Sequence, residues 1–215
     1  RLSDAQNLRF SAAQTLARPE YRELSPISYR DMLGEREVFG DSSLVRTRVE
    51  NYDVRWELYP NSGEVLSFGL FAKRFHDPIE PIDVATSGAS QLSFTNAEGA
   101  VNYGVEVEGR KQLGFLHPAL SPFSGFVNAT LIRSEIRTGN SRLSALTNDD
   151  RPMVGQAPYV VNAGLTYSGP DEGASATLLY NVVGKRMVSA AVMPLNADTY
   201  EMPRHVLDVS LRLPL

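Results

Sequence analysis

Stretches that alternate apolar and polar residues recur eight times, and the gaps between them alternate between long and short. The stretches are 7–18, 51–60, 65–78, 101–116, 123–138, 158–168, 174–192 and 205–215. The gaps hold about 32, 4, 22, 6, 19, 5 and 12 residues, as read from alternation and turn residues. This rhythm is typical of a strand meander in a membrane, because such a meander has short turns on one side and long loops on the other.

Composition narrows the class of protein further. The chain has 215 residues, no cysteine, a net charge of -4 and a mean hydropathy of -0.21. It contains no apolar run long enough for a transmembrane helix, whereas barrel strands distribute their apolar residues by alternation. The absence of cysteine excludes a disulfide scaffold and thiolate chemistry. The slight acidity argues against a nucleic-acid partner.

Alternate residues of each stretch lie on opposite faces of a strand. In 51–60, Trp56 points one way while Arg55 and Glu57 point the other. The polar faces carry charges of both signs, as the wall of a water-filled lumen would. The residues that we expect to face this lumen are Asp53, Arg55, Glu57, Glu106, Glu108, Arg110, Asp208 and Arg212.

Two interpretations compete at this point, since a soluble antiparallel sheet with one buried face also alternates. Strands of ten to nineteen residues exceed the soluble mode of about 5–6 residues and favour a membrane barrel. Tyrosines near strand ends, such as Tyr52, Tyr103 and Tyr159, fit an interfacial girdle. A passive porin, a small eight-stranded barrel and a soluble β-rich binding or adhesion domain therefore remain alternatives.

The long gaps hold irregular sequence, and 26–37 could form a short helix or turn. Loops of such length in a compact domain are usually functional. We expect 27–50, 83–96 and 140–151 to form an extracellular entrance that meets a ligand. The candidate entrance residues are Arg30, Asp31, Arg142, Asn148, Asp149, Asp150 and Arg151.

Six segments give the chain a recognisable series of motifs. They read TLARPEYRELSP at 15–26, NYDVRWELYP at 51–60, FAKRF at 71–75, FTNA and YGVEVE at 94–97 and 103–108, RPMVGQAPY at 151–159, and PRHVLDVS at 203–210. In this order, they resemble the C-terminal part of the barrel of TonB-dependent outer-membrane receptors. The resemblance implies an all-β antiparallel meander of about eight long strands, forming an arc of a large transmembrane β-barrel in the bacterial outer membrane.

The resemblance also implies a direction and a function. Odd-numbered stretches would climb outward, so that long gaps lie outside the cell and short turns in the periplasm. A scarce ligand, such as a siderophore, a vitamin, a glycan or a peptide, would bind from outside and enter by TonB-energised uptake, without enzymatic chemistry. The implied partners are outer-membrane lipid, the receptor's own plug domain, TonB and a small ligand.

Residues 1–215 would then be one partial barrel domain. Transporters of this type have about 22 strands around a plugged lumen, so we expect the plug domain and the closing strands to lie outside these 215 residues. His76, His117 and His205 lack metal-ligand spacing, and no catalytic motif occurs. We therefore expect no metal site, no cofactor and no catalytic residue.

Overall fold

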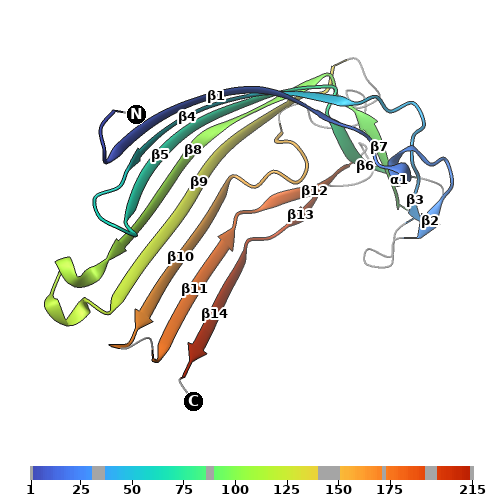
Figure 1. Cartoon of the computed structure of the whole chain (residues 1–215). Helices are drawn as coiled ribbons and strands as arrows, with labels where there is room; N and C mark the ends of the chain where they lie inside the picture. The colour runs from blue at the N-terminus through green and yellow to red at the C-terminus, as the bar shows by residue number, and fades with distance from the viewer. Residues whose placement is uncertain are drawn as a thin grey trace.

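Eight long strands lie side by side in one curved antiparallel sheet, which we call the wall sheet (Figure 1). The computed structural model describes residues 2–30, 37–85, 90–139, 151–170, 173–191 and 198–213. The wall strands are β1 (Gln6–Ala17), β4 (Thr47–Leu58), β5 (Val65–His76), β8 (Gly99–Gln112), β9 (Phe123–Arg137), β10 (Tyr159–Ser168), β11 (Ser175–Val183) and β14 (Arg204–Arg212). Each pairs with the next in this order, so the predicted meander is confirmed.

A second sheet of six short strands, which we call the crown sheet, lies at the end of the wall where the long connections emerge (Figure 1). Its strands are β2 (Tyr29–Arg30), β3 (Glu37–Val38), β6 (Ile79–Ala85), β7 (Ser90–Asn96), β12 (Arg186–Ala191) and β13 (Thr199–Glu201). The expectation that the long gaps are irregular was therefore wrong. The strands β2, β3 and β13 have only two or three residues and give no local alternation. The parallel pairs of β12 with β6 and of β3 with β7 join segments that lie far apart in the sequence.

The connection after β1 also differs from expectation. A single helical turn, α1 (Tyr21–Leu24), forms before the predicted 26–37 segment, and its capping box joins the Glu20 amide to the Glu23 carboxylate at 2.8 Å. Within 26–37, β2 occupies Tyr29–Arg30, while residues 31–36 lie outside the described part of the chain.

The predicted stretch 174–192 is two strands rather than one. It breaks at Gly184, whose amide donates to the Tyr159 carbonyl at 2.9 Å. A Cβ at Gly184 would lie 3.0 Å from the Tyr159 ring, so this close approach favours glycine. Beyond the break, β12 leaves the wall and joins the crown sheet, which ties the two sheets together.

The turns at the other end of the wall are short, as predicted. Gly63, with φ +78, lies in the turn between β4 and β5, where its positive φ suits glycine. Two 3-10 turns, η1 (Leu113–Phe115) and η2 (Pro118–Leu120), connect β8 with β9. We call this end of the wall the inner end and the crown end the outer end.

The register separates the wall into two faces over all of its strands. One row of directly opposed residues runs through Phe10, Val54, Leu70 and Val105, and is apolar. Most of these apolar side chains are exposed, with Phe10 at 73%, Leu70 at 48% and Val54 at 38%. No protein layer covers this face within the described structure, which fits a surface that lipid covers.

The buried core lies where wall and crown meet. It consists of Ile82, Ala97, Ala100 and Ile136, with partly buried side chains packed around it. The crown therefore has a packed interior of its own, and the wall adds residues to that interior only at its outer end. None of the described helices has the length and apolar content to cross a membrane.

Candidate functional site

All eight predicted lumen residues lie on one face of the wall, opposite the apolar rows. The row through Arg110 passes through Phe126, Gly164 and Leu179 and reaches Asp208 on β14. The remaining members join this face by period-two spacing and direct opposition, as Arg55, Gly69 and Glu106 illustrate. The register thus brings the set together, while its assignment to a lumen stays a prediction.

A chain of ion pairs crosses this polar face. Arg9 contacts Glu57 at 3.1 Å, Arg55 contacts Glu57 at 3.2 Å, and Arg55 also reaches Glu108 at 2.5 Å. The last contact spans β5, because the β5 residues opposite Arg55 and Glu57 are the small Gly69 and Ser67. Glu57 is only 5% exposed, so its charge is held by arginines rather than by open water.

Two aromatic rings on the polar face cover glycines of the next strand. A Cβ at Gly104 would lie 2.8 Å from the Phe71 ring, and one at Gly164 would lie 2.2 Å from the Phe126 ring. Glycine thus provides the space that each ring occupies, as in aromatic rescue of glycine in sheets. This explains why Phe71 breaks the simple alternation of its strand.

A buried ion pair fixes the crown close to the wall. The Arg151 guanidinium donates to the Glu80 carboxylate at 2.8 Å, with side-chain exposures of 2% and 1%. The Val154 amide also donates to Glu80 at 3.3 Å. Burial raises the pKa of the Glu80 carboxyl, and the hydrogen bond from Arg151 opposes this rise. In the same region, the Ser189 hydroxyl donates to Asp83 at 2.5 Å.

Arg151 was expected on the ligand entrance. The structure instead buries its side chain where the crown sheet meets the wall sheet. Its partner Glu80 is 71 positions away in the sequence, so no local pattern reveals the pairing. Arg30 is exposed on β2 and lies opposite Glu37. The other candidate entrance residues, Asp31, Arg142, Asn148, Asp149 and Asp150, lie outside the described residues.

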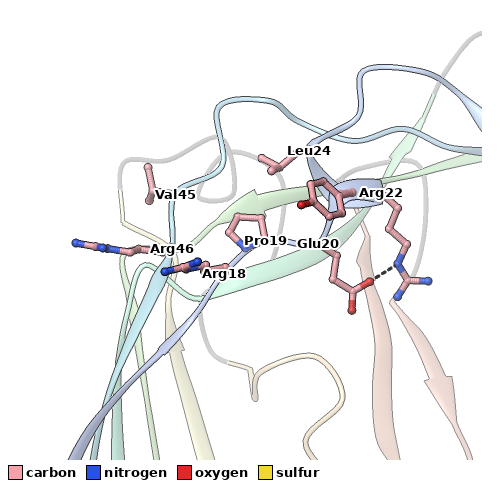
Figure 2. A pocket seen from close by; sticks show the side chains of 8 residues that line it. Arg18, Pro19, Glu20, Arg22, Leu24, Val45 and Arg46 are labelled. Carbon is pink, nitrogen blue, oxygen red and sulfur yellow. Dashed lines mark ion pairs between the residues drawn. The ribbon is translucent and has the colours of Figure 1, made fainter.

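A groove with a volume of about 1020 Å³ lies between the outer ends of β1 and β4. In Figure 2, Arg18 and Arg46 extend to one side of it, away from Glu20 and Arg22. Glu20 and Arg22 form an ion pair at 2.7 Å. Arg18 and Arg46 have no carboxylate partner within the described ranges, so the groove has one neutralised half and one cationic half. Its lining comprises Arg18, Pro19, Glu20, Tyr21, Arg22, Leu24, Val45 and Arg46.

The histidines make contacts of other kinds. His76 lies 3.2 Å from the Glu50 carboxylate, and His205 lies 2.7 Å from the Tyr180 hydroxyl. His117 caps the turn η2, where its ring accepts from the Ala119 amide at 3.2 Å. Within the described ranges, no group of three or more His, Asp or Glu side chains is placed to hold a metal ion.

Three ionic residues escaped the sequence-based selection. Arg9 could have been found, because period-two spacing on β1 places it on the polar face. Glu64 carries no such signal; it accepts from Asn61 at 2.8 Å and pairs with Lys111 at 3.1 Å at the inner end. Glu80 depends on the distant Arg151, as described above.

Comparisons with known proteins agree with this geometry. The profile of the family described as "TonB dependent receptor-like, beta-barrel" matches residues 1–215. A search of curated protein sequences finds no significant match.

Solved structures share the fold. A variant of the ferric enterobactin receptor PfeA from Pseudomonas aeruginosa, in complex with enterobactin, superposes with a TM-score of 0.64 and 15% identity, covering 100% of this chain and 32% of that one. The copper transporter OprC gives 0.65 and 17%, covering 97% and 29%. The siderophore receptor PirA from Pseudomonas aeruginosa gives 0.59 and 16%, covering 99% and 40%.

This chain thus spans 29% to 40% of the length of these three structures. Because the identities are low, the solved structures show only a common fold. The family match over residues 1–215 shows membership of the family. The wall sheet is an arc of a large barrel of this kind. The chain belongs to the TonB-dependent receptor-like β-barrel family, whose members are proteins of the Gram-negative outer membrane.

Proposed function

We propose that this chain forms part of the wall and of the outer mouth of a receptor. This receptor imports a scarce ligand across the outer membrane, with energy delivered through TonB. The observation that carries the proposal is the division of the wall sheet into one continuous polar face and one exposed apolar face. A surface with lipid on one side and a hydrated lumen on the other needs this division.

The proposed task of the wall is mechanical and electrostatic rather than chemical. The backbone groups of neighbouring wall strands pair with one another, which a lipid environment requires. The Arg9, Glu57, Arg55 and Glu108 chain neutralises its own charges. We propose that Arg110, Asp208 and the other lumen residues outside this chain of ion pairs face the receptor's plug, and that the wall performs no bond chemistry.

The proposed ligand enters through the crown. The crown sheet stands at the outer end of the wall. The segments 27–50, 83–96 and 140–151, without the buried Arg151, remain our proposed ligand-contacting regions. PfeA binds enterobactin and OprC is a copper transporter, so a siderophore or another metal-bearing ligand is the first class to test. Vitamins, glycans and peptides are the further classes.

Two alternatives that the sequence left open, a closed eight-stranded barrel and a soluble domain, fit the wall sheet poorly. A closed eight-stranded barrel requires β1 to pair with β14, but these strands occupy opposite ends of the strand order, and no pairing between them occurs in the described residues (Figure 1). A soluble binding or adhesion domain would cover its large apolar face, whereas Leu207, Val209 and Leu211 are 64%, 66% and 71% exposed.

The experiment compares uptake of a panel of radiolabelled ferric siderophores and cobalamin by cells with the complete receptor, cells lacking it, and cells lacking TonB. We expect one ligand to accumulate only when both receptor and TonB are present. Uptake that persists without TonB would instead support a passive porin. Cell-surface immunodetection of the receptor in every strain controls for its expression.

Orientation is tested separately with single cysteines, which the chain lacks naturally. Ser42→Cys lies in an exposed outer connection and Ala119→Cys in the exposed turn η2. In intact cells, a membrane-impermeant maleimide should label Ser42→Cys and should leave Ala119→Cys unmodified. The reverse labelling would invert the proposed direction of the wall.

A further inference from the structure

The apolar face of the wall ends in arginines at its outer end. Arg48 on β4, Arg74 on β5 and Arg133 on β9 share this face with Tyr52 and its neighbours, by direct opposition and period-two spacing. Arg18, the residue after β1, continues the same parity. All four side chains are exposed. We call Arg18, Arg48, Arg74 and Arg133 the arginine belt.

The belt steps outward in a regular way from β9 to β1. Arg74 lies two rows outward from the row of Arg133, and Arg48 lies two rows outward from Arg74. Arg18 lies two rows beyond Arg48. The belt therefore climbs six rows over the four steps that separate β9 from β1 in the strand order. The average is about 1.5 residues per strand, close to the ~1.2 that a strand tilt of about 40° produces.

The inner turns show the same stagger independently. The row through Leu66 reaches Ala163 three strand steps later, on β10. The β4–β5 pairing ends at the Leu58 and Leu66 pair, whereas the β10–β11 pairing ends at Ser168, five residues inward of Ala163. The slope of the belt thus matches the slope of the wall's own edge. The four arginines consequently lie at one level, parallel to the membrane plane.

The belt holds an excess of positive charge. Arg18, Arg48 and Arg74 have no carboxylate within salt-bridge distance among the residues that the structure describes. Arg133 contacts Glu135 at 2.8 Å, but both side chains are more than half exposed, so this pair is weak. Arg137, two rows outward of Glu135, lines a pocket with a volume of about 400 Å³ together with Arg74 and the carboxylate Glu98.

The inner edge of the apolar face is different. Its described residues include a single cation, Lys111, which is already bound to Glu64 at 3.1 Å. A cationic belt at one edge alone indicates an anionic layer on that side of the membrane. An interface with the same lipid on both sides gives no reason for such asymmetry.

We propose that the arginine belt binds the phosphate groups of the phosphorylated glycolipid that forms the outer leaflet of the outer membrane. Guanidinium groups bind phosphate oxygens in bidentate pairs, and the level row of exposed arginines directly beyond the apolar band lies where lipid headgroups begin. The proposal rests on the outer-membrane location of the chain and is independent of the imported ligand.

The test uses the complete receptor in detergent, with native mass spectrometry counting bound lipid. The probes are bis-phosphorylated lipid A, the same lipid without phosphates, and a zwitterionic phospholipid. Of the three lipids, we expect phosphorylated lipid A to bind most tightly to the unmodified receptor. This binding should weaken as the salt concentration rises. Replacing Arg48, Arg74 and Arg133 together by Gln should lower this affinity on the order of a hundredfold, from the strength of basic residues near anionic surfaces.

Two controls keep the result interpretable. Arg110→Gln removes a cation from the opposite face and should leave lipid A binding unchanged. Replacing the same three belt residues by Lys should restore much of the affinity, because the charge is kept. Equal affinity of the unmodified receptor for lipid A with and without phosphates would overturn the proposal, even if the triple variant failed to fold. Unchanged binding by the folded triple variant would overturn it as well.

Discussion

The wall sheet and the crown sheet are held together in different ways. The wall consists of long strands in register, with large apolar side chains on its outer surface and ion pairs on its polar face. The crown consists of short strands around buried residues such as Ile82 and Met187. The membrane therefore stabilises the wall by covering its apolar face, whereas the crown depends on its own packing and on buried polar pairs.

The largest expected effect lies in the crown. Arg151→Met leaves the buried Glu80 carboxylate without its guanidinium, and breaking such a pair costs about 3–5 kcal/mol. Hydrogen exchange of β6 amides in the complete receptor should show this loss, while exchange of β10 stays slow. The double variant, Arg151→Met with Glu80→Gln, should recover part of the lost protection of the β6 amides. Unchanged β6 protection in Arg151→Met would show that the pair does not hold the crown.

The effect of Arg151→Met on the protection of β6 should depend on pH. Burial raises the pKa of Glu80, so the folded crown binds a proton more readily than the unfolded chain between the ordinary and the raised pKa. The free energy of opening therefore falls as pH rises through that window. Without Arg151 the pKa rises further, so we expect the defect in β6 protection to be smaller at pH 5 than at pH 8.

The next effect belongs to the wall. Val107→Arg puts a charge on the apolar face and should cost about 2–4 kcal/mol of unfolding free energy, as for arginine near the centre of a bilayer. Thr130→Arg, on the polar face opposite Glu106, is the matched control and should cost far less. Urea unfolding of the complete receptor in lipid vesicles measures both. Similar costs at the two positions would remove the distinction between the faces.

A smaller effect tests the packing of rings on glycines. Gly164→Ala places a Cβ where the Phe126 ring lies, and such overpacking costs about 1–3 kcal/mol. Gly109→Ala is the control, because its added Cβ would meet Val127 at an ordinary 3.7 Å. The same urea unfolding should separate the two variants, and equal stability would mean that the ring moves aside freely.

The smallest effect is expected at the inner turn. Hydrogen bonds from Asn61 and Lys111 hold the pKa of Glu64 below its ordinary value. This contribution is present above the ordinary pKa and is lost as pH falls through the lowered one. Glu64→Gln should therefore lower the Tm at pH 7 and leave it unchanged at strongly acidic pH. A difference from the unmodified receptor that is the same at both pH values would contradict the role of the charge.

The wall could be predicted from the sequence because its signal is local. Alternation around Trp56 and Val105 fixes each strand and its faces, and short turns fix which strands are neighbours. The crown could not be predicted, because Ala190 of β12 pairs with Ile82 of β6 more than a hundred positions away. Arg151 shows the same limit: as a charged loop residue it looked exposed, and only the fold reveals its buried partner.

The central claim is that the two faces of the wall meet two solvents, and single cysteines along β8 test it most directly. Positions 103 to 108 are replaced one at a time in a complete receptor free of other cysteines, in lipid vesicles. Glu106→Cys and Glu108→Cys should react with a water-soluble maleimide, while Val105→Cys and Val107→Cys should stay unmodified, because lipid excludes the reagent and disfavours the reactive thiolate, so that reactivity alternates with period two. Uniform reactivity, or alternation of the opposite parity, would contradict the account.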